Sequence, residues 1–309
     1  MLLITDSCLL KANMIQKLNS LFPARDIIID IIIMRIRLTF GLVNRGSELP
    51  YHHQYLITEF LDSYIRHYLQ SINYPEKVFY NFSSLKGQTS IGKEGLIFNS
   101  PRVSIVFSSN DQGLIESLVN QLMSNEELVL GKLILNPLHV DQEIPVQFKI
   151  AMKYLCLSPL TIIPSDDQEE IDLKRFVHPS LDAFSDSLYE DTMYRMEQAG
   201  YSAEELEQYF QFQLVPDKEY LDKIRGEEKK FARVFPIYTT DGEKLEVRGY
   251  TFPFTLYAHP KVHEFIFVCG LGAFAKNGFG MLDIANEDPH LRIISYTKKI
   301  NGAYLERRI

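Results

Sequence analysis

The order of strand-like and helix-like patterns in residues 34–140 constrains the fold of this chain most. The first pattern, MRIRLTFG, alternates apolar residues with Arg35, Arg37 and Thr39, which is typical of a half-buried strand. The patterns are, in chain order, a strand at 34–41, a helix at 57–69, strands at 77–85 and 102–109, a helix at 112–123 and one or two strands at 127–140. This order predicts a ferredoxin-like βαββαβ unit.

The second half of the chain roughly repeats this order, although without an obvious sequence repeat. Its patterns are a strand at 151–163, a helix at 178–200, a short acidic helix near 203–211, a hairpin around Asp241 and Gly242, a helix at 260–270 and a strand at 279–285. We therefore predict an α+β protein of two tandem ferredoxin-like (RRM-like) domains, 34–148 and 149–309.

The first 33 residues do not fit either unit. The run DIIIDIII (26–33) is rich in β-branched residues but has little amphipathic pattern, and a well-formed strand begins directly after it at Met34. Our hypothesis is that residues 1–33 are an upstream extension and that the native chain starts at Met34.

Composition limits the class of protein. The three cysteines lie far apart without metal-binding or redox spacing, and no apolar run is long enough to span a bilayer, so we expect a cytoplasmic protein without a metal site. The net charge of −8 is uneven, because residues 165–228 carry 18 acidic and 6 basic side chains. The remainder of the chain is therefore mildly basic, which leaves room for a phosphate-binding surface.

The segment GLGAFAKNGFG (270–280) is the most unusual motif. It nearly satisfies a dinucleotide-binding pattern, but a predicted helix precedes it and a strand follows, which is the reverse of the required order. A P-loop needs Ser or Thr after its lysine, and Asn277 follows Lys276. Two interpretations remain: a glycine-rich turn that packs closely against the fold, or backbone N–H groups that line a groove for phosphates together with Lys276.

From Met34 to about Ile284 the chain resembles the CRISPR repeat-processing endoribonucleases, the sixth Cas family of the RAMP superfamily. The motifs that carry the resemblance are MRIRLTF, LPYHHQYLITEFLDSYI, VFYNFSSLKG, LCLSPLTII and GYTFPFTLYAHPKVHEFIFVCGLGAFAKNGFGM. The resemblance implies two ferredoxin-like domains that bind the CRISPR repeat and cut the precursor once per repeat, without metal or cofactor. The 2′-OH attacks the adjacent phosphate and leaves a 2′,3′-cyclic phosphate and a 5′-OH.

One departure from the family concerns the general base. Many members have a histidine after the first helix, whereas this chain has LQSINYPEKVFYNFS there. Histidine suits proton transfer near neutrality, and lysine suits stabilisation of the phosphorane. The catalytic candidates are His67, His52 and His53, with Tyr64 and Lys77 as helpers. The RNA-binding candidates are Lys276, Asn277, Gly270, Gly272, Gly278, Gly280, Arg35 and Arg37.

The missing histidine leaves alternatives to the enzyme open. The chain could be an inactive protein that binds CRISPR repeat RNA, or a structural RAMP subunit of an interference complex with other Cas proteins. We expect no membrane partner and a monomer or homodimer.

Overall fold

The computed structural model describes residues 34–309 apart from 165–171, 240, 297, 301–302 and 306–309, and side chains only up to residue 296. The described residues all belong to one compact unit, residues 33–309. The predicted extension 1–33 lies outside the described residues, so the hypothesis of a start at Met34 stays a prediction.

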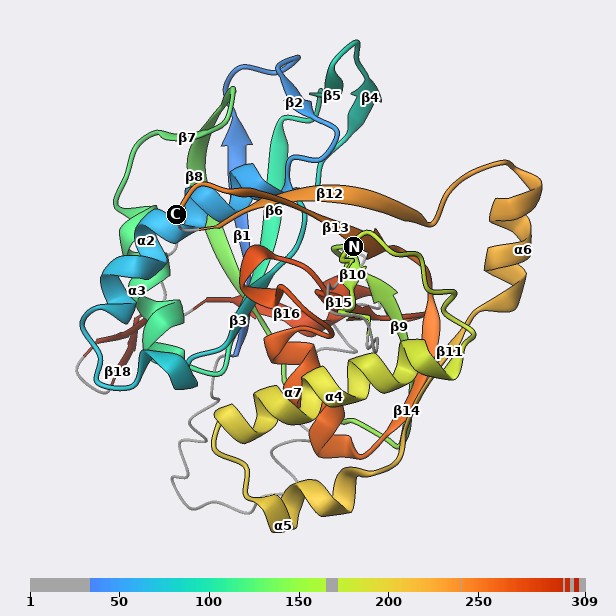
Figure 1. Ribbon diagram of the computed structural model, residues 1–309. Helices are drawn as coiled ribbons and strands as arrows, with labels where there is room; N and C mark the ends of the chain where they lie inside the picture. Colours follow the sequence, from blue (N-terminus) through green and yellow to red (C-terminus); the bar gives the residue numbers. More distant parts are fainter. Residues whose placement is uncertain (1–33, 165–171, 240, 297, 301–302, 306–309) are drawn as a thin grey trace, which may run out of the picture. The chain divides into compact units, whose positions relative to one another are not determined.

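The N-terminal half is built on one antiparallel sheet in the order β16-β8-β1-β6-β3, with β7 paired to β8. Its strands are β1 (Arg35–Leu42), β3 (Tyr80–Phe82), β6 (Arg102–Ser109), β7 (Leu128–Leu130), β8 (Leu133–Glu143) and β16 (Ile293–Ser295). Helices α2 (Gln54–Leu69) and α3 (Gln112–Met123) lie side by side (Figure 1) and pack with the buried face of β1 in one core. The strand predicted at 77–85 is shorter than expected, while 102–109 and 112–123 match β6 and α3.

A small second sheet, in the order β2-β5-β4, extends from this half. Its strands are β2 (Glu48–Pro50), β4 (Thr89–Ile91) and β5 (Gly95–Phe98), and none of them was predicted. They are short, and β4 is exposed throughout, so they leave no alternating apolar pattern in the sequence.

The C-terminal half is built on the antiparallel sheet β11-β14-β9-β15. Its strands are β9 (Ala151–Cys156), β11 (Phe212–Pro216), β14 (Phe254–Ala258) and β15 (Leu282–Ile284). Helices α4 (Asp182–Gln198) and α7 (Pro260–Cys269) contribute Phe184, Leu188 and Ile266 to a second core. The prediction missed β11 and joined β9 to a separate strand, β10 (Leu160–Thr161).

The remaining elements surround these two sheets. A third sheet, β10-β13-β12, contains the predicted hairpin at Gly242, formed by β12 (Ala232–Tyr238) and β13 (Lys244–Tyr250). The short elements are η1 (Pro75–Lys77), α5 (Ala203–Leu206), η2 (Glu207–Tyr209), α6 (Lys218–Gly226), η3 (Ala275–Asn277), η4 (Pro289–Arg292), β17 (Lys298–Ile300) and β18 (Ala303–Leu305). The protein is thus an α+β protein with several antiparallel sheets. Within the described residues, the helices are too short or too polar to cross a lipid bilayer.

Candidate nucleic-acid interface

The glycine-rich segment connects α7 to β15 and packs against the N-terminal half. Gly270, Gly272, Gly278 and Gly280 are all buried and all have positive φ. A Cβ at Gly278 would collide with the side chains of Gln54 and Phe82, and one at Gly270 would collide with Asn81. Glycine is therefore required at these positions by both backbone conformation and space.

Hydrogen bonds hold the same segment in place from α2 and β3. The Gln54 amide donates to the Gly278 carbonyl (2.9 Å), the Asn81 amide donates to the Phe279 carbonyl (2.7 Å), and the Thr58 hydroxyl donates to the Asn277 carbonyl (3.2 Å). The segment is thus fixed between the two halves of the chain.

The backbone N–H groups of three of the four glycines point inward. The N–H groups of Gly270, Gly278 and Gly280 donate to the carbonyls of Ile266, Ala275 and Pro159, whereas the β-bridge of Gly272 with Thr161 is made through the Ala273 N–H. The N–H groups of Gly270, Gly278 and Gly280 are therefore engaged within the fold and are not available to phosphates, contrary to the prediction, while the prediction for Gly272 stays a prediction. The alternative interpretation, a turn that packs closely against the fold, describes all four glycines.

Lys276 remains accessible at the outer side of this segment. It lies in η3 between Phe274 and Gly278, both in the left-handed conformation, and its side chain is exposed. Its Nζ lies 5.5 Å from the ring centre of Phe79 and 5.9 Å from that of Tyr80. Partial burial of the ammonium group lowers the pKa of Lys276. Asn277 is half-buried behind it and lines a small cavity with Tyr55 and Tyr238.

A second cation lies close to Tyr80. Arg66 and Asp62 form an ion pair one turn apart on α2. Burial raises the pKa of the Tyr80 hydroxyl, Asp62 raises it further, and Arg66 opposes this. We call Asp62, Arg66, Phe79, Tyr80 and Lys276 the lysine cluster. The sequence analysis did not identify Arg66 or Tyr80, because only the fold brings α2, β3 and η3 together.

His67 lies on another side of α2. At about 100° per residue, His67 is about 180° around the helix from Thr58, which contacts the glycine-rich segment. Its side chain is exposed. Tyr64 lies near it, is half-buried against Phe60 at 5.6 Å, and has a pKa raised by burial. Neither residue joins the lysine cluster, and Tyr64 acts as a packing residue.

The two histidines before α2 have different surroundings. His53 is buried, packs on Phe98 at 5.8 Å, and its Nδ1 donates to the Pro50 carbonyl at 3.0 Å. Burial lowers its pKa. His53 therefore belongs to the core, and its assignment as a catalytic candidate is wrong. His52 is half-buried against Phe235 at 4.7 Å, and its pKa is lowered by burial and then by Arg233.

Lys77 is exposed in η1, two residues before Phe79. Its ammonium group lies 5.5 Å from the ring centre of Tyr74. It therefore lies in the segment that leads directly into the lysine cluster.

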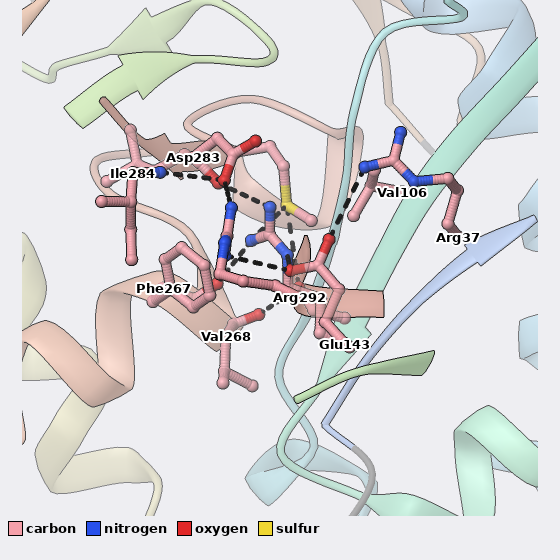
Figure 2. A network of polar contacts seen from close by, with 12 residues as sticks. Arg37, Val106, Glu143, Phe267, Val268, Asp283, Ile284 and Arg292 are labelled. Carbon is pink, nitrogen blue, oxygen red and sulfur yellow. Dashed lines mark hydrogen bonds and ion pairs between the residues drawn. The ribbon is translucent and has the colours of Figure 1, made fainter. Parts of the chain in front are cut away.

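Arg35 lies inside the protein, in an ion network formed by Arg35, Glu143, Asp283 and Arg292. Figure 2 shows Glu143, Asp283 and Arg292 converging, with Arg37 at the edge. Arg35 pairs with Glu143 (2.8 Å) and donates to the carbonyls of Phe267 (3.1 Å) and Leu282 (2.7 Å). Burial lowers its pKa, although Glu143 opposes this. With 3% of its side chain exposed, Arg35 joins the two halves of the chain and is not an RNA contact.

Arg37 lies two residues further along β1, 3.9 Å from Glu143, and reaches an open hollow of about 370 Å³. We call this the basic hollow; its charged and ionisable lining is formed by Arg37, Lys86, Arg102, His139, Asp141 and His290. Among all the described residues, including those of the hollow, no group of three or more His, Cys, Asp or Glu side chains is placed to hold a metal ion.

The fold places this chain among α+β proteins with several antiparallel sheets. Over most of its length the chain resembles solved structures. A Cas6-related protein from Pyrococcus furiosus matches with a TM-score of 0.66 and 17% identity, over 82% of this chain and 99% of that one. A RAMP protein described as binding different RNA substrates matches with a TM-score of 0.65 and 15% identity, over 82% of this chain and 100% of that one. A CRISPR-associated Cas6 protein matches with a TM-score of 0.61 and 19% identity, over 82% and 99%.

The sequence itself identifies the family. Residues 142–284 match the family model for the C-terminal region of the CRISPR-associated protein Cas6. This part of the chain is therefore the C-terminal region of a Cas6-family CRISPR-associated protein. No curated protein sequence matches it.

Proposed function

We propose that this protein is a metal-independent endoribonuclease that cuts CRISPR precursor transcripts within each repeat and produces crRNA. The Cas6 family match supports the choice of substrate. The single observation on which the proposal depends is the lysine cluster. Among the described residues, no carboxylate lies within 4.0 Å of the Lys276 ammonium, so its charge is available to a phosphate.

The proposal includes the domain organisation. We interpret residues 34–148 and 149–309 as tandem ferredoxin-like domains. In support, four strands of each main sheet follow the same spatial order, β8-β1-β6-β3 in one and β15-β9-β14-β11 in the other. If the four strands of each half are numbered in chain order, both sheets have the spatial order 4-1-3-2. Helices follow the first and third of these strands in each half, as the ferredoxin-like unit requires.

The proposed reaction is an internal transesterification. The 2′-oxygen forms a bond to the adjacent phosphorus, the bond from phosphorus to the 5′-oxygen breaks, and the 2′-OH proton passes to a base while the leaving oxygen gains a proton. Lys276 and Arg66 would stabilise the charge on the phosphorane. Because the pKa of Tyr80 is raised, its hydroxyl stays protonated and can donate a hydrogen bond to a phosphate oxygen.

The base for the 2′-OH is to be chosen among the predicted candidates that solvent can reach. Of the predicted candidates, His67, His52 and Lys77 keep some exposure, and none has a described contact with Lys276. His67 is the first to test, because it is the histidine within α2. The alternative function is an inactive protein that binds repeat RNA, either alone or as a structural RAMP subunit. The absence of a histidine from the lysine cluster favours this alternative.

The deciding experiment incubates the purified protein with a transcript containing the repeat from the CRISPR array nearest its gene, in EDTA. A single cut per repeat that leaves a 2′,3′-cyclic phosphate supports the enzyme. A 2′-deoxy substitution at the cut nucleotide should abolish cleavage and leave binding intact. Tight binding without cleavage of any repeat RNA supports the alternative.

A further inference from the structure

Arg195, on α4, is a buried arginine that caps the C-terminal end of the neighbouring helix α7 (Figure 1). Its two terminal guanidinium nitrogens donate to the carbonyls of Cys269 (3.0 Å) and Gly270 (2.7 Å). Its Nε donates to Asp191, one turn earlier on α4, at 2.8 Å. The last carbonyls of a helix lack partners within the helix, and a buried carbonyl without a partner is costly. Arg195 therefore satisfies two carbonyls at the point where the glycine-rich segment leaves α7.

This contact fixes the start of the glycine-rich segment. Gly270 has a φ of 83°, so the chain turns out of the helix at a residue whose carbonyl Arg195 holds. Lys276 follows six residues later. The end of the segment is held separately from α2 and β3, by the amides of Gln54 and Asn81. The position of Lys276 is thus set from both ends, and Arg195 acts at the first of them.

A row of aromatic contacts connects Arg195 to Lys276 by a second route. The guanidinium carbon of Arg195 lies 5.6 Å from the ring centre of Phe265 on α7. Phe265 packs against Phe79 with 5.9 Å between the ring centres, and the Lys276 ammonium lies 5.5 Å from the ring centre of Phe79. Both rings are buried. In a closely packed interior, a shift of Arg195 or Phe265 would displace the ring against which Lys276 lies.

We propose that Arg195 is a positioning residue that holds Lys276 against Phe79, where the proposed function requires a cation for the RNA phosphate. The inference rests on the proposed function for the role of Lys276. Arg195 acts through Lys276 and not on RNA directly, because it is 8% exposed and each of its three guanidinium nitrogens has a partner within the protein. The helix α4 thereby contributes to the site, although none of its residues belongs to the lysine cluster.

The first test follows Lys276 by NMR without RNA, so it does not depend on the proposed function. The lysine Cε signals of isotope-labelled protein are followed to high pH, and the Lys276 signal is identified by its loss in Lys276→Arg. The charged and titratable groups on the facing elements are Tyr80, with Asp62 and Arg66 beside it, and the test leaves them unchanged.

In the wild-type protein, partial burial keeps the pKa of Lys276 below its ordinary 10.5. In Arg195→Lys, a single ammonium group cannot reproduce the planar fork that serves two carbonyls and a carboxylate. Lys276 should then be released toward water, and its pKa should rise toward 10.5.

The matched control is Arg225→Lys, the same exchange at an exposed ion pair with Asp222 on α6, which should leave the pKa of Lys276 unchanged. A pKa of Lys276 that keeps its wild-type value in Arg195→Lys would overturn the inference. If Arg195→Lys does not fold, Phe265→Leu interrupts the aromatic route instead. The same rise in the pKa of Lys276 would support the inference, and an unchanged value would overturn it.

The second test is a double-mutant cycle on the affinity for repeat RNA that carries the 2′-deoxy substitution at the cut nucleotide. Lys276→Gln should weaken binding by roughly tenfold in the wild-type background, but by less than about twofold in Arg195→Lys, where the lysine is no longer held in place. Equal effects in the two backgrounds would contradict the inference. If Lys276→Gln does not weaken binding in the wild-type background, the proposed RNA contact of Lys276 is wrong, whereas the NMR result for Arg195 stands.

Discussion

Gly278 offers the sharpest test of how the glycine-rich segment is held. Its φ of 77° lies in the left-handed region, where a residue with a Cβ costs about 1–2 kcal/mol. The Cβ of Gly278→Ala would also overlap Gln54 and the ring of Phe82, of which Phe82 is 1% exposed and Gln54 is 4% exposed. Overpacking of a closed core costs about 1–3 kcal/mol. We therefore expect Gly278→Ala to lower the free energy of unfolding by about 2–5 kcal/mol.

The chain provides a matched control for the steric part. Gly242, in the β12–β13 turn, has a φ of 82°, and apart from its chain neighbours no atom of the described residues lies within 4 Å of the position of an added Cβ. Gly242→Ala should therefore cost only the backbone part, about 1–2 kcal/mol. Urea unfolding of both variants, compared at unchanged m, measures the difference. Equal losses in the two variants would refute the conclusion that Gly278 is required by close contact with α2 and β3.

The remaining predictions concern charge and catalysis. Because burial lowers the pKa of Lys276 below its ordinary 10.5, RNA affinity should fall with rising pH earlier than an ordinary lysine allows; Lys276→Arg should remove this loss up to pH 10.5, as a titration with 2′-deoxy-substituted RNA would show. Glu143→Gln leaves Arg35 and Arg292 without their shared carboxylate and should cost about 3–5 kcal/mol in urea unfolding, whereas Glu246→Gln, at an exposed ion pair, should cost far less. If His67 is the base, His67→Ala should slow single-turnover cleavage by roughly a hundredfold to ten-thousandfold with little change in affinity, and an unaltered rate would move the assignment to His52.

The N-terminal fold could be predicted because its signal is local. The alternation in MRIRLTF matches a strand with one face against two helices, and the same pattern places Arg37 on the open face. Arg35 has the same periodicity, yet the C-terminal half covers its end of the strand. No local pattern distinguishes Arg35 from Arg37, because the difference depends on contacts with residues more than 200 positions away.

The site was harder to predict for a related reason. Glycine is required both in exposed loops that bind phosphate and in turns packed against side chains, so the composition of 270–280 could not decide between them. The ring of Phe79 and the ion pair of Arg66 come from separate elements that meet only in the fold. His53 lies four residues before Ile57, in line with the apolar stripe of the helix, which favours a structural role over a catalytic one, and the structure buries it on Phe98 while His52 packs against the β12–β13 hairpin.

The strand β16 has a consequence for how the chain can be divided. After completing the C-terminal sheet, the polypeptide returns to the N-terminal sheet, where Ile293 pairs with Glu143 and the Ile144 N–H donates to the Arg292 carbonyl at 2.7 Å. The two halves are therefore interleaved in sequence. A fragment that stops at Ile284 would lack Arg292 and strand β16. The part of β8 that pairs with β16 would then be an exposed sheet edge, with which another molecule could pair. Excised halves would consequently be poor surrogates for the intact chain.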